Sequence, residues 1–172
     1  MKQLRSFFTV TMIAVMLVGA LDANAKTKRS KTNKSKSKTT KTTKTPKKSH
    51  QSDYDLEFFQ QVAKFANMET PIDCGEGIVV KSITMEGTKF CFNYSVTDDE
   101  LCEMIRDYPD LFTSFMKSEG IVKDLRNDMF DDDGMLDAVI RLGITFNFRI
   151  YAQGEMKPLL VIPITGKEMK NI

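Results

Sequence analysis

The 172-residue sequence has a single histidine, His50, and it precedes the stretch whose composition is that of a folded domain. A serine or cysteine nucleophile needs a neighbouring base, and a typical zinc site needs imidazole ligands. Residues 51–172 contain no imidazole, so this part of the chain argues against a hydrolase of that kind and against a typical zinc site. We therefore expect no cofactor, no metal and no catalytic residues.

Acidic residues, in contrast, are plentiful: residues 51–172 contain 22 of them. An enzyme of unusual type that uses two carboxylates stays open as an alternative, although so many acids make any two look paired. The aspartates around Gly134 do not fit a calcium loop, because alignment on that glycine puts Met129 at the first ligand position and Ile140 at the last. Acids at the start of a helix explain them better.

Long apolar runs are absent except near the N-terminus, where residues 1–25 have the three parts of a signal peptide. Lys2 and Arg5 come first, residues 7–21 are apolar, and Ala23-Asn24-Ala25 forms the small-x-small cleavage pattern. No cysteine follows to carry a lipid. We expect an exported protein, periplasmic or secreted, with no transmembrane span after cleavage. An uncleaved N-terminal anchor is the alternative.

Residues 26–50 lack both acids and large apolar side chains, and they carry ten lysines and one arginine, a net charge of +11. Such a segment cannot bury enough surface to fold, so we predict a disordered, extended linker. A polycation of this kind serves either as a spacer or as an element that adheres to anionic surfaces. It has no aromatic residue to stack on bases, which argues against specific nucleic-acid binding.

Residues 51–172 carry 12 basic and 22 acidic residues, a net charge of −10, and their number suits a single domain. Apolar residues at helical spacing predict a first helix that begins near Asp55 and ends before Pro71. The Thr97-to-Glu100 capping box predicts a second helix, and further helical stretches run to Gly143. A second capping box at Thr165 predicts a short terminal helix.

Two hairpins interrupt the helical pattern. Alternating residues with a turn at Glu86-Gly87 predict the first, over 79–96, with Val79 and Ile83 facing the core and Lys81 interrupting that row. Alternation over 144–151 and a turn near Gly154 predict the second. The expected fold class is therefore α+β, with a mostly antiparallel four-stranded sheet made from two β-hairpins and helices packed on one face. Pro163 marks the last strand as an edge or as bulged at that residue.

The segment Asn67-Met68-Glu69-Thr70-Pro71, followed by two aromatic hairpins, resembles a family of small uncharacterised exported bacterial proteins. The resemblance rests on an Asn-x-x-x-Pro segment, a strand pair ending in alternating aromatics, a helical middle and a hairpin led by glycine. It covers residues 65–169 and excludes the lysine-rich linker. It implies export and implies no activity.

Three cysteines, Cys74, Cys91 and Cys102, lie in a chain expected to meet an oxidising compartment. The start of the first hairpin should lie beside Val96, and Cys102 follows within little more than one helical turn, so we expect a disulfide between Cys74 and Cys102. Three reduced thiols are the alternative, and a free Cys91 could also cross-link two chains.

The polar sides of the two hairpins form the candidate binding surface. Its predicted residues are Asn93, Ser95, Thr145, Asn147, Arg149 and Tyr151. Arginine and tyrosine are among the residues that most often anchor an interface. A solvated sheet face without a role is the alternative. We hypothesise an exported, non-catalytic binding module for an envelope or extracellular component, and an inhibitor or structural partner protein is a further alternative.

Overall fold

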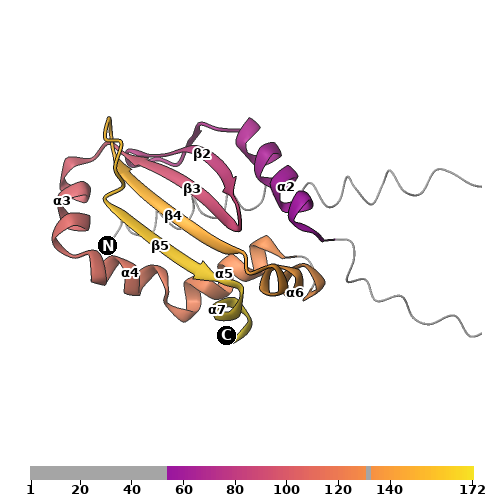
Figure 1. Ribbon diagram of the computed structural model, residues 1–172. Coiled ribbons are helices and arrows are strands. Elements are labelled where there is room, and N and C mark those ends of the chain that lie inside the picture. The colour runs from indigo at the N-terminus through magenta and orange to yellow at the C-terminus, as the bar shows by residue number, and fades with distance from the viewer. Residues whose placement is uncertain (1–53, 131–132) are drawn as a thin grey trace, which may run out of the picture.

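The computed structural model describes residues 54–130 and 133–172, so the predicted signal peptide and lysine-rich linker lie outside the described residues. The chain order is helix, three strands, four helices, two strands and a short helix (Figure 1). The bounds are α2 Leu56–Met68, β1 Ile72–Asp73, β2 Ile78–Glu86, β3 Lys89–Val96, α3 Asp99–Asp107, α4 Pro109–Met116, α5 Glu119–Met129, α6 Asp133–Leu142, β4 Thr145–Ala152, β5 Leu160–Thr165 and α7 Gly166–Lys170.

The sheet has five strands in the order β1-β2-β3-β4-β5. Both predicted hairpins are present, but β3 and β4 pair in parallel, so the expected four-stranded, mostly antiparallel sheet is wrong in strand number and in its central pair. The physical reason is the path of the connection: α3 to α6 carry the chain back to the start of β3, where the Thr145 amide donates to the Thr88 carbonyl oxygen at 3.0 Å. β4 then runs alongside β3 in the same direction.

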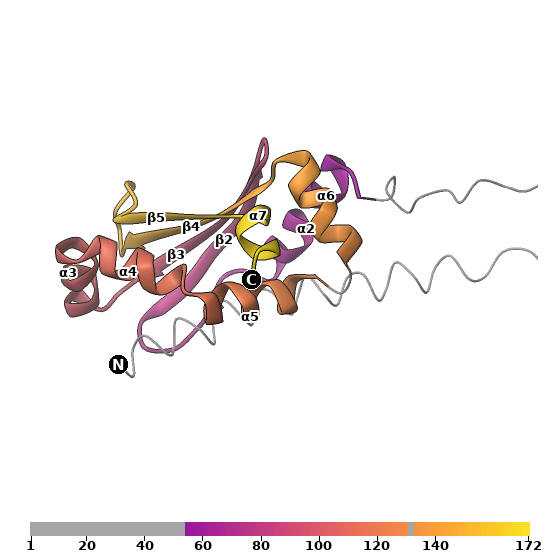
Figure 2. The ribbon, with the colours of Figure 1, turned by 90° about the horizontal axis from the view of Figure 1, so that it is seen from below.

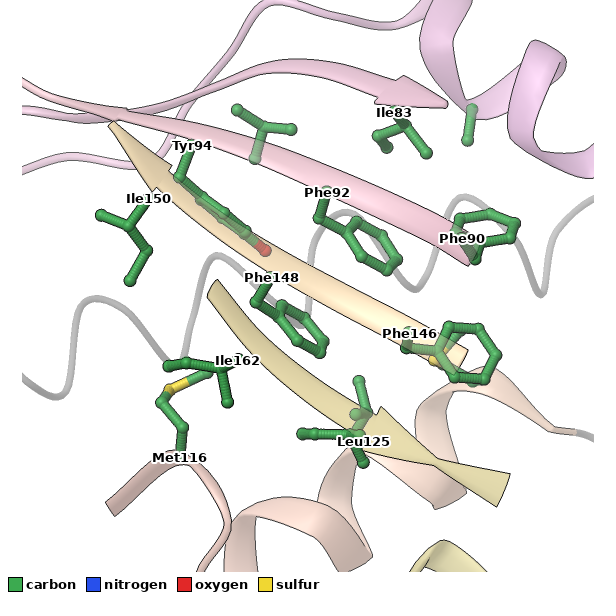
Figure 3. Packing of buried hydrophobic residues seen from close by; sticks show 14 of the residues in the cluster. Ile83, Phe90, Phe92, Tyr94, Met116, Leu125, Phe146, Phe148, Ile150 and Ile162 are labelled. Carbon is green, nitrogen blue, oxygen red and sulfur yellow. The ribbon is translucent and has the colours of Figure 1, made fainter. Parts of the chain in front are cut away.

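The core forms where matched aromatic rows of β3 and β4 meet the helices. The parallel register sets Phe90 beside Phe146 and Phe92 beside Phe148, and the second pair stacks with ring centroids 5.1 Å apart (Figure 3). Figure 2 shows α3, α4 and α5 following one another alongside the sheet. Their apolar residues join the same buried cluster as the aromatic rows, which confirms an α+β domain with a helix-covered apolar face.

A bulge in β2 changes which residues face that core. The β2–β3 register shifts between Val80 and Ser82, so Lys81 is left exposed and Val80 is fully buried. The sequence pattern placed Val79 and Lys81 on the core side, and this placement is wrong. A bulge inserts one unpaired residue and reverses the alternation before it, and here it removes a lysine from an apolar face.

The start of α7 and the end of α6 follow the sequence signals, whereas the start of α3 differs from them. Thr165 and Glu168 form the predicted capping box of α7. Gly143, with a φ of 66°, ends α6, and the next amide, that of Ile144, donates to the Val139 carbonyl oxygen as in a Schellman motif. At α3, however, the cap is the Asp98 carboxylate, because the Thr97 hydroxyl donates instead to the Gly77 carbonyl oxygen.

All three cysteines are free thiols, so the expected bridge between Cys74 and Cys102 is wrong. The prediction correctly placed the start of β2 beside Val96, since Ile78 pairs with it. Cys74, however, follows β1, which lies on the far side of β2 from β3. Its thiol donates back to the Ile72 carbonyl oxygen, whereas the Cys102 thiol is directed at Val96 in the core.

Asn67 ties the end of α2 to the sheet and gives the Asn-x-x-x-Pro segment a structural role. Its Oδ1 accepts from the Ile83 amide at 2.8 Å and from the Thr70 hydroxyl at 3.3 Å. A cis peptide bond between Thr70 and Pro71 follows. The Asn67 side chain thus provides a hydrogen-bond acceptor for an amide of β2 that the two-residue strand β1 does not pair with.

Replacing Asn67 by alanine should lower the free energy of unfolding by about 1–3 kcal/mol, because the Ile83 amide would lose its acceptor. Chemical denaturation of the purified protein measures this change. The exposed Lys64 on the same helix provides the control, and Lys64→Ala should leave stability within about 0.5 kcal/mol. Equal stability of the two variants would show that the Asn67 bond contributes nothing.

The turn before β2 holds three consecutive residues with positive φ: Gly75, Glu76 and Gly77. Glycine adopts this conformation without steric cost, whereas Glu76 does not. A Cβ added at Gly77 would lie 2.5 Å from the Thr97 hydroxyl oxygen. The turn therefore requires glycine at 77 and tolerates a strained residue at 76.

Two substitutions in this turn should move stability in opposite directions. Gly77→Ala should cost about 2 kcal/mol through the close approach to Thr97, and Glu76→Gly should add about 0.5–1 kcal/mol by removing strain. Thermal unfolding of both variants tests the pair. A Gly77→Ala variant as stable as the wild type would disprove the close approach.

Candidate functional site

The polar face is the side of the sheet opposite the aromatic rows, and the structure brings all the predicted binding residues together on it. The parallel register pairs Asn93 with Arg149 and Ser95 with Tyr151, with Asn147 and Thr145 further along β4. β2 adds Ser82 and Thr84, which pair with Asn93 and Cys91. The polar face comprises Ser82, Thr84, Glu86, Cys91, Asn93, Ser95, Thr145, Asn147, Arg149 and Tyr151.

The polar face is less exposed to solvent than the alternating sequence pattern of its strands predicts. Ser95 and Asn147 are only 2% and 6% exposed, and Cys91 is fully buried. Asn93, Thr145, Arg149 and Tyr151 are half-buried. A binding partner would therefore contact mainly the half-buried side chains of this face.

An arginine–glutamate pair spans the middle of this face. Arg149 on β4 donates to Glu86 at the end of β2 through two bonds, Nη1 to Oε1 at 2.7 Å and Nη2 to Oε2 at 2.6 Å. The hydrogen bonds from Arg149 lower the pKa of Glu86, and Glu86 in turn raises the pKa of Arg149. Because β3 lies between the two strands, the pair crosses over it near Cys91.

Glu86 was missed by sequence reasoning, which assigned it to a turn. A usable signal existed, since Glu86 follows Thr84 by two residues and so continues the polar side of β2. Its pairing with Arg149 was not readable, because the two residues are 63 positions apart and lie on strands that are not adjacent.

Hydrogen-bonding groups surround the ion pair. The Asn93 amide donates to the Ser82 hydroxyl at 3.0 Å, and the Asn147 amide donates to the Thr145 carbonyl oxygen at 3.3 Å. The buried hydroxyls of Thr84 and Ser95 have no hydrogen-bond partner within the described part of the chain. A buried polar group without a partner is costly, so these two hydroxyls are positions where a ligand or water would be stabilising.

The chemistry of the face is that of recognition by charge and hydrogen bonds. Burial raises the pKa of the Cys91 thiol, which disfavours the nucleophilic thiolate. Among residues 54–130 and 133–172, no group of three or more histidine, cysteine, aspartate or glutamate side chains could hold a metal ion.

Within these same ranges, no helix is long and apolar enough to cross a membrane.

The Glu86 carboxyl should titrate below its ordinary range, and Arg149→Ala should return its pKa toward the unperturbed value of about 4.3. Because the folded pKa is lowered, the pair stabilises the protein above the unfolded pKa, and this contribution is lost as the pH falls through the folded pKa. Glu86 is half-exposed, so the contribution is small. A carboxyl carbon NMR titration of both proteins measures the shift. An unchanged pKa in the variant would contradict the pairing.

Comparison with known proteins gives a likeness of fold. No protein-family model matches the chain, and no curated protein matches it either. Among solved structures, it is similar to the 1.60 Å crystal structure of a presumed secreted protein from Pseudomonas aeruginosa. The two share 18% sequence identity with a TM-score of 0.50, and the match covers 66% of this chain and 90% of the other.

Proposed function

We propose that this chain is an exported, non-enzymatic binding module that uses the polar face to hold another component of the cell envelope or extracellular space. Export is supported by the signal-peptide pattern of residues 1–25 and by the fold shared with a presumed secreted protein. The residue types present support binding rather than catalysis, because residues 51–172 offer no imidazole.

The observation that carries the proposal is the arrangement of the polar face itself. Arg149 is fixed by two hydrogen bonds at the centre, with its side chain 20% exposed. Tyr151, Asn93 and the Ser95 hydroxyl, which has no hydrogen-bond partner among the described residues, lie around it. An ordered arginine beside a tyrosine is a common anchor of an interface, because little side-chain entropy remains to be lost on binding.

The lysine-rich segment 26–50 supplies a second, less specific contact. Its charge of +11 attracts anionic envelope surfaces, and this attraction weakens as salt screens it. The body carries −10 and is repelled by the same surfaces. The segment therefore holds the module near a surface while the polar face selects the partner.

Pull-down from an envelope fraction tests both parts. The mature chain and a chain without residues 26–50 are compared at low and high salt, together with the double variant Asn93→Ala/Tyr151→Ala. Loss of the segment should reduce retention at low salt only, and loss of the face residues should reduce it at both. Lys123→Ala, an exposed change on α5, is the control and should change nothing. If removal of residues 26–50 has no effect at either salt, the adhesion role is lost.

A further inference from the structure

The Cys91 thiol lies under the ion pair that crosses the polar face. Cys91 belongs to β3, the strand between β2 and β4 (Figure 1), and it is 0% exposed. Glu86 pairs with Lys89, two residues before Cys91. Arg149 pairs with Asn93, two residues after it. The line that joins the Glu86 carboxylate to the Arg149 guanidinium therefore crosses β3 at the level of Cys91.

The electrostatic surroundings of this sulfur place both charged groups close to it. Burial raises the pKa of the Cys91 thiol, the Arg149 guanidinium lowers it, and the Glu86 carboxylate raises it. Side chains alternate along a strand, so residues 89, 91 and 93 share the polar side of β3 with the ion pair. The two bonds of the pair, at 2.6 and 2.7 Å, hold the guanidinium in one position over the thiol.

Cys91 and Cys102 are both buried, but by different means. Cys102 lies on α3 and belongs to the hydrophobic core cluster. Cys91 is on the other side of the sheet, where the Arg149 and Glu86 side chains are 20% and 52% exposed. Its burial therefore depends on polar side chains at the protein surface instead of packed apolar ones. Such a thiol becomes reachable when those side chains move, which local fluctuations permit without unfolding.

We propose that the Arg149–Glu86 pair is a cover that keeps the Cys91 thiol inaccessible, and that loss of the pair opens a route to this thiol in the folded protein. The reaction that the cover prevents is exchange with a small disulfide. In that exchange the thiolate sulfur bonds to one half of the disulfide, and the other half leaves as a thiolate. The cover requires no binding partner, so it is independent of the proposed role of the polar face.

Timed reaction of the mature chain with the neutral reagent dipyridyl disulfide, followed by peptide mass spectrometry, measures the rate at each cysteine. We expect Cys91 to react at least about tenfold faster in Arg149→Ala and in Glu86→Ala than in the wild type. A change of charge alone predicts opposite effects. Loss of the guanidinium would slow the reaction by disfavouring the thiolate, whereas loss of the carboxylate would speed it. Faster reaction in both variants therefore reports access to the thiol.

Cys102 distinguishes local opening from general destabilisation in the same experiment. Its rate should keep the wild-type value in both variants, because the hydrophobic core buries it. Lys117→Ala, which removes an ion pair between α4 and α7, is the matched control and should leave the rate at Cys91 unchanged. A wild-type rate at Cys91 in either variant, or equal acceleration at Cys91 and Cys102, would overturn the inference.

Discussion

Phe148→Ala should lower the free energy of unfolding by about 3–5 kcal/mol, the largest loss expected from a single substitution in this fold. Phe148 lies on the parallel strand pair at the centre of the sheet and is 1% exposed. Its ring stacks on Phe92 at 5.1 Å and lies 6.4 Å from Tyr94. Removing the ring leaves a cavity that the two neighbouring strands cannot close, because their backbone hydrogen bonds fix them in place.

Thermal unfolding measures the effect, and the midpoint should fall by roughly 10–20 °C. The neighbouring residue Asn147 on the opposite face gives the control. Asn147→Ala should cost about 1 kcal/mol or less, because within the described residues its amide bonds only to the Thr145 carbonyl oxygen, two residues earlier on the same strand. Phe148→Leu, which keeps most of the apolar volume, should fall in between. Equal stability of the Phe148→Ala and Asn147→Ala proteins would contradict the assignment of the aromatic rows as the core.

Arg149→Glu should have the largest effect on function, because it removes the central cation of the polar face and sets two carboxylates against each other. Retention of the partner should fall about 30-fold or more, the loss expected of an interface anchor worth about 2 kcal/mol. Stability should fall by about 1–2 kcal/mol, since a bidentate pair is replaced by repulsion at a site where Glu86 is half-exposed.

The charge-swapped double variant, Glu86→Arg with Arg149→Glu, separates these two effects. It restores an ion pair across β3 and should regain most of the lost stability, as a denaturation experiment would show. The guanidinium then projects from the end of β2 instead of the middle of β4, so partner binding should stay weak. If the swap leaves the stability as low as in Arg149→Glu alone, the two residues do not interact as the structure shows.

Local patterns predicted the elements well because each is encoded by its own residues. Alternation identified both hairpins, and the Gly143 and Thr165 signals placed the boundaries of α6 and α7. The orientation of β4 relative to β3 was not encoded locally. It depends on which end of β3 the chain reaches after the four helices α3 to α6. The alternating pattern of β4 fits a parallel or an antiparallel neighbour equally well.

Single-residue irregularities caused the remaining errors. The bulge at Lys81 reverses the pattern of β2 for the residues before it, and no strong turn residue announces it. The short strand β1 then directs Cys74 to the outer edge of the sheet, so the thiol expected to meet Cys102 lies on the wrong side of β2. The first error arises from assuming an uninterrupted strand over 79–85, and the second arises because strand β1 was not predicted.

The sequence predicted which residues belong to the candidate site, but not how these residues pair and contact one another. Period-two alternation assigned Asn93, Thr145, Asn147, Arg149 and Tyr151 to one face, and the structure places them there. Their register across β3 and β4, the reach of Arg149 to Glu86 and the burial of Ser95 all depend on strand order. Sequence spacing carries no information on pairing between strands so far apart in the chain.

The role of the polar face is tested most directly by envelope pull-down with the wild type, Arg149→Glu and the charge-swapped double variant, using the mature chain at high salt. High salt suppresses the contribution of residues 26–50 and leaves recognition by the folded body. We predict strong retention by the wild type and weak retention by both variants, although the double variant should regain most of the stability lost in Arg149→Glu. Full retention by the two variants would contradict the assignment of this face as the binding surface.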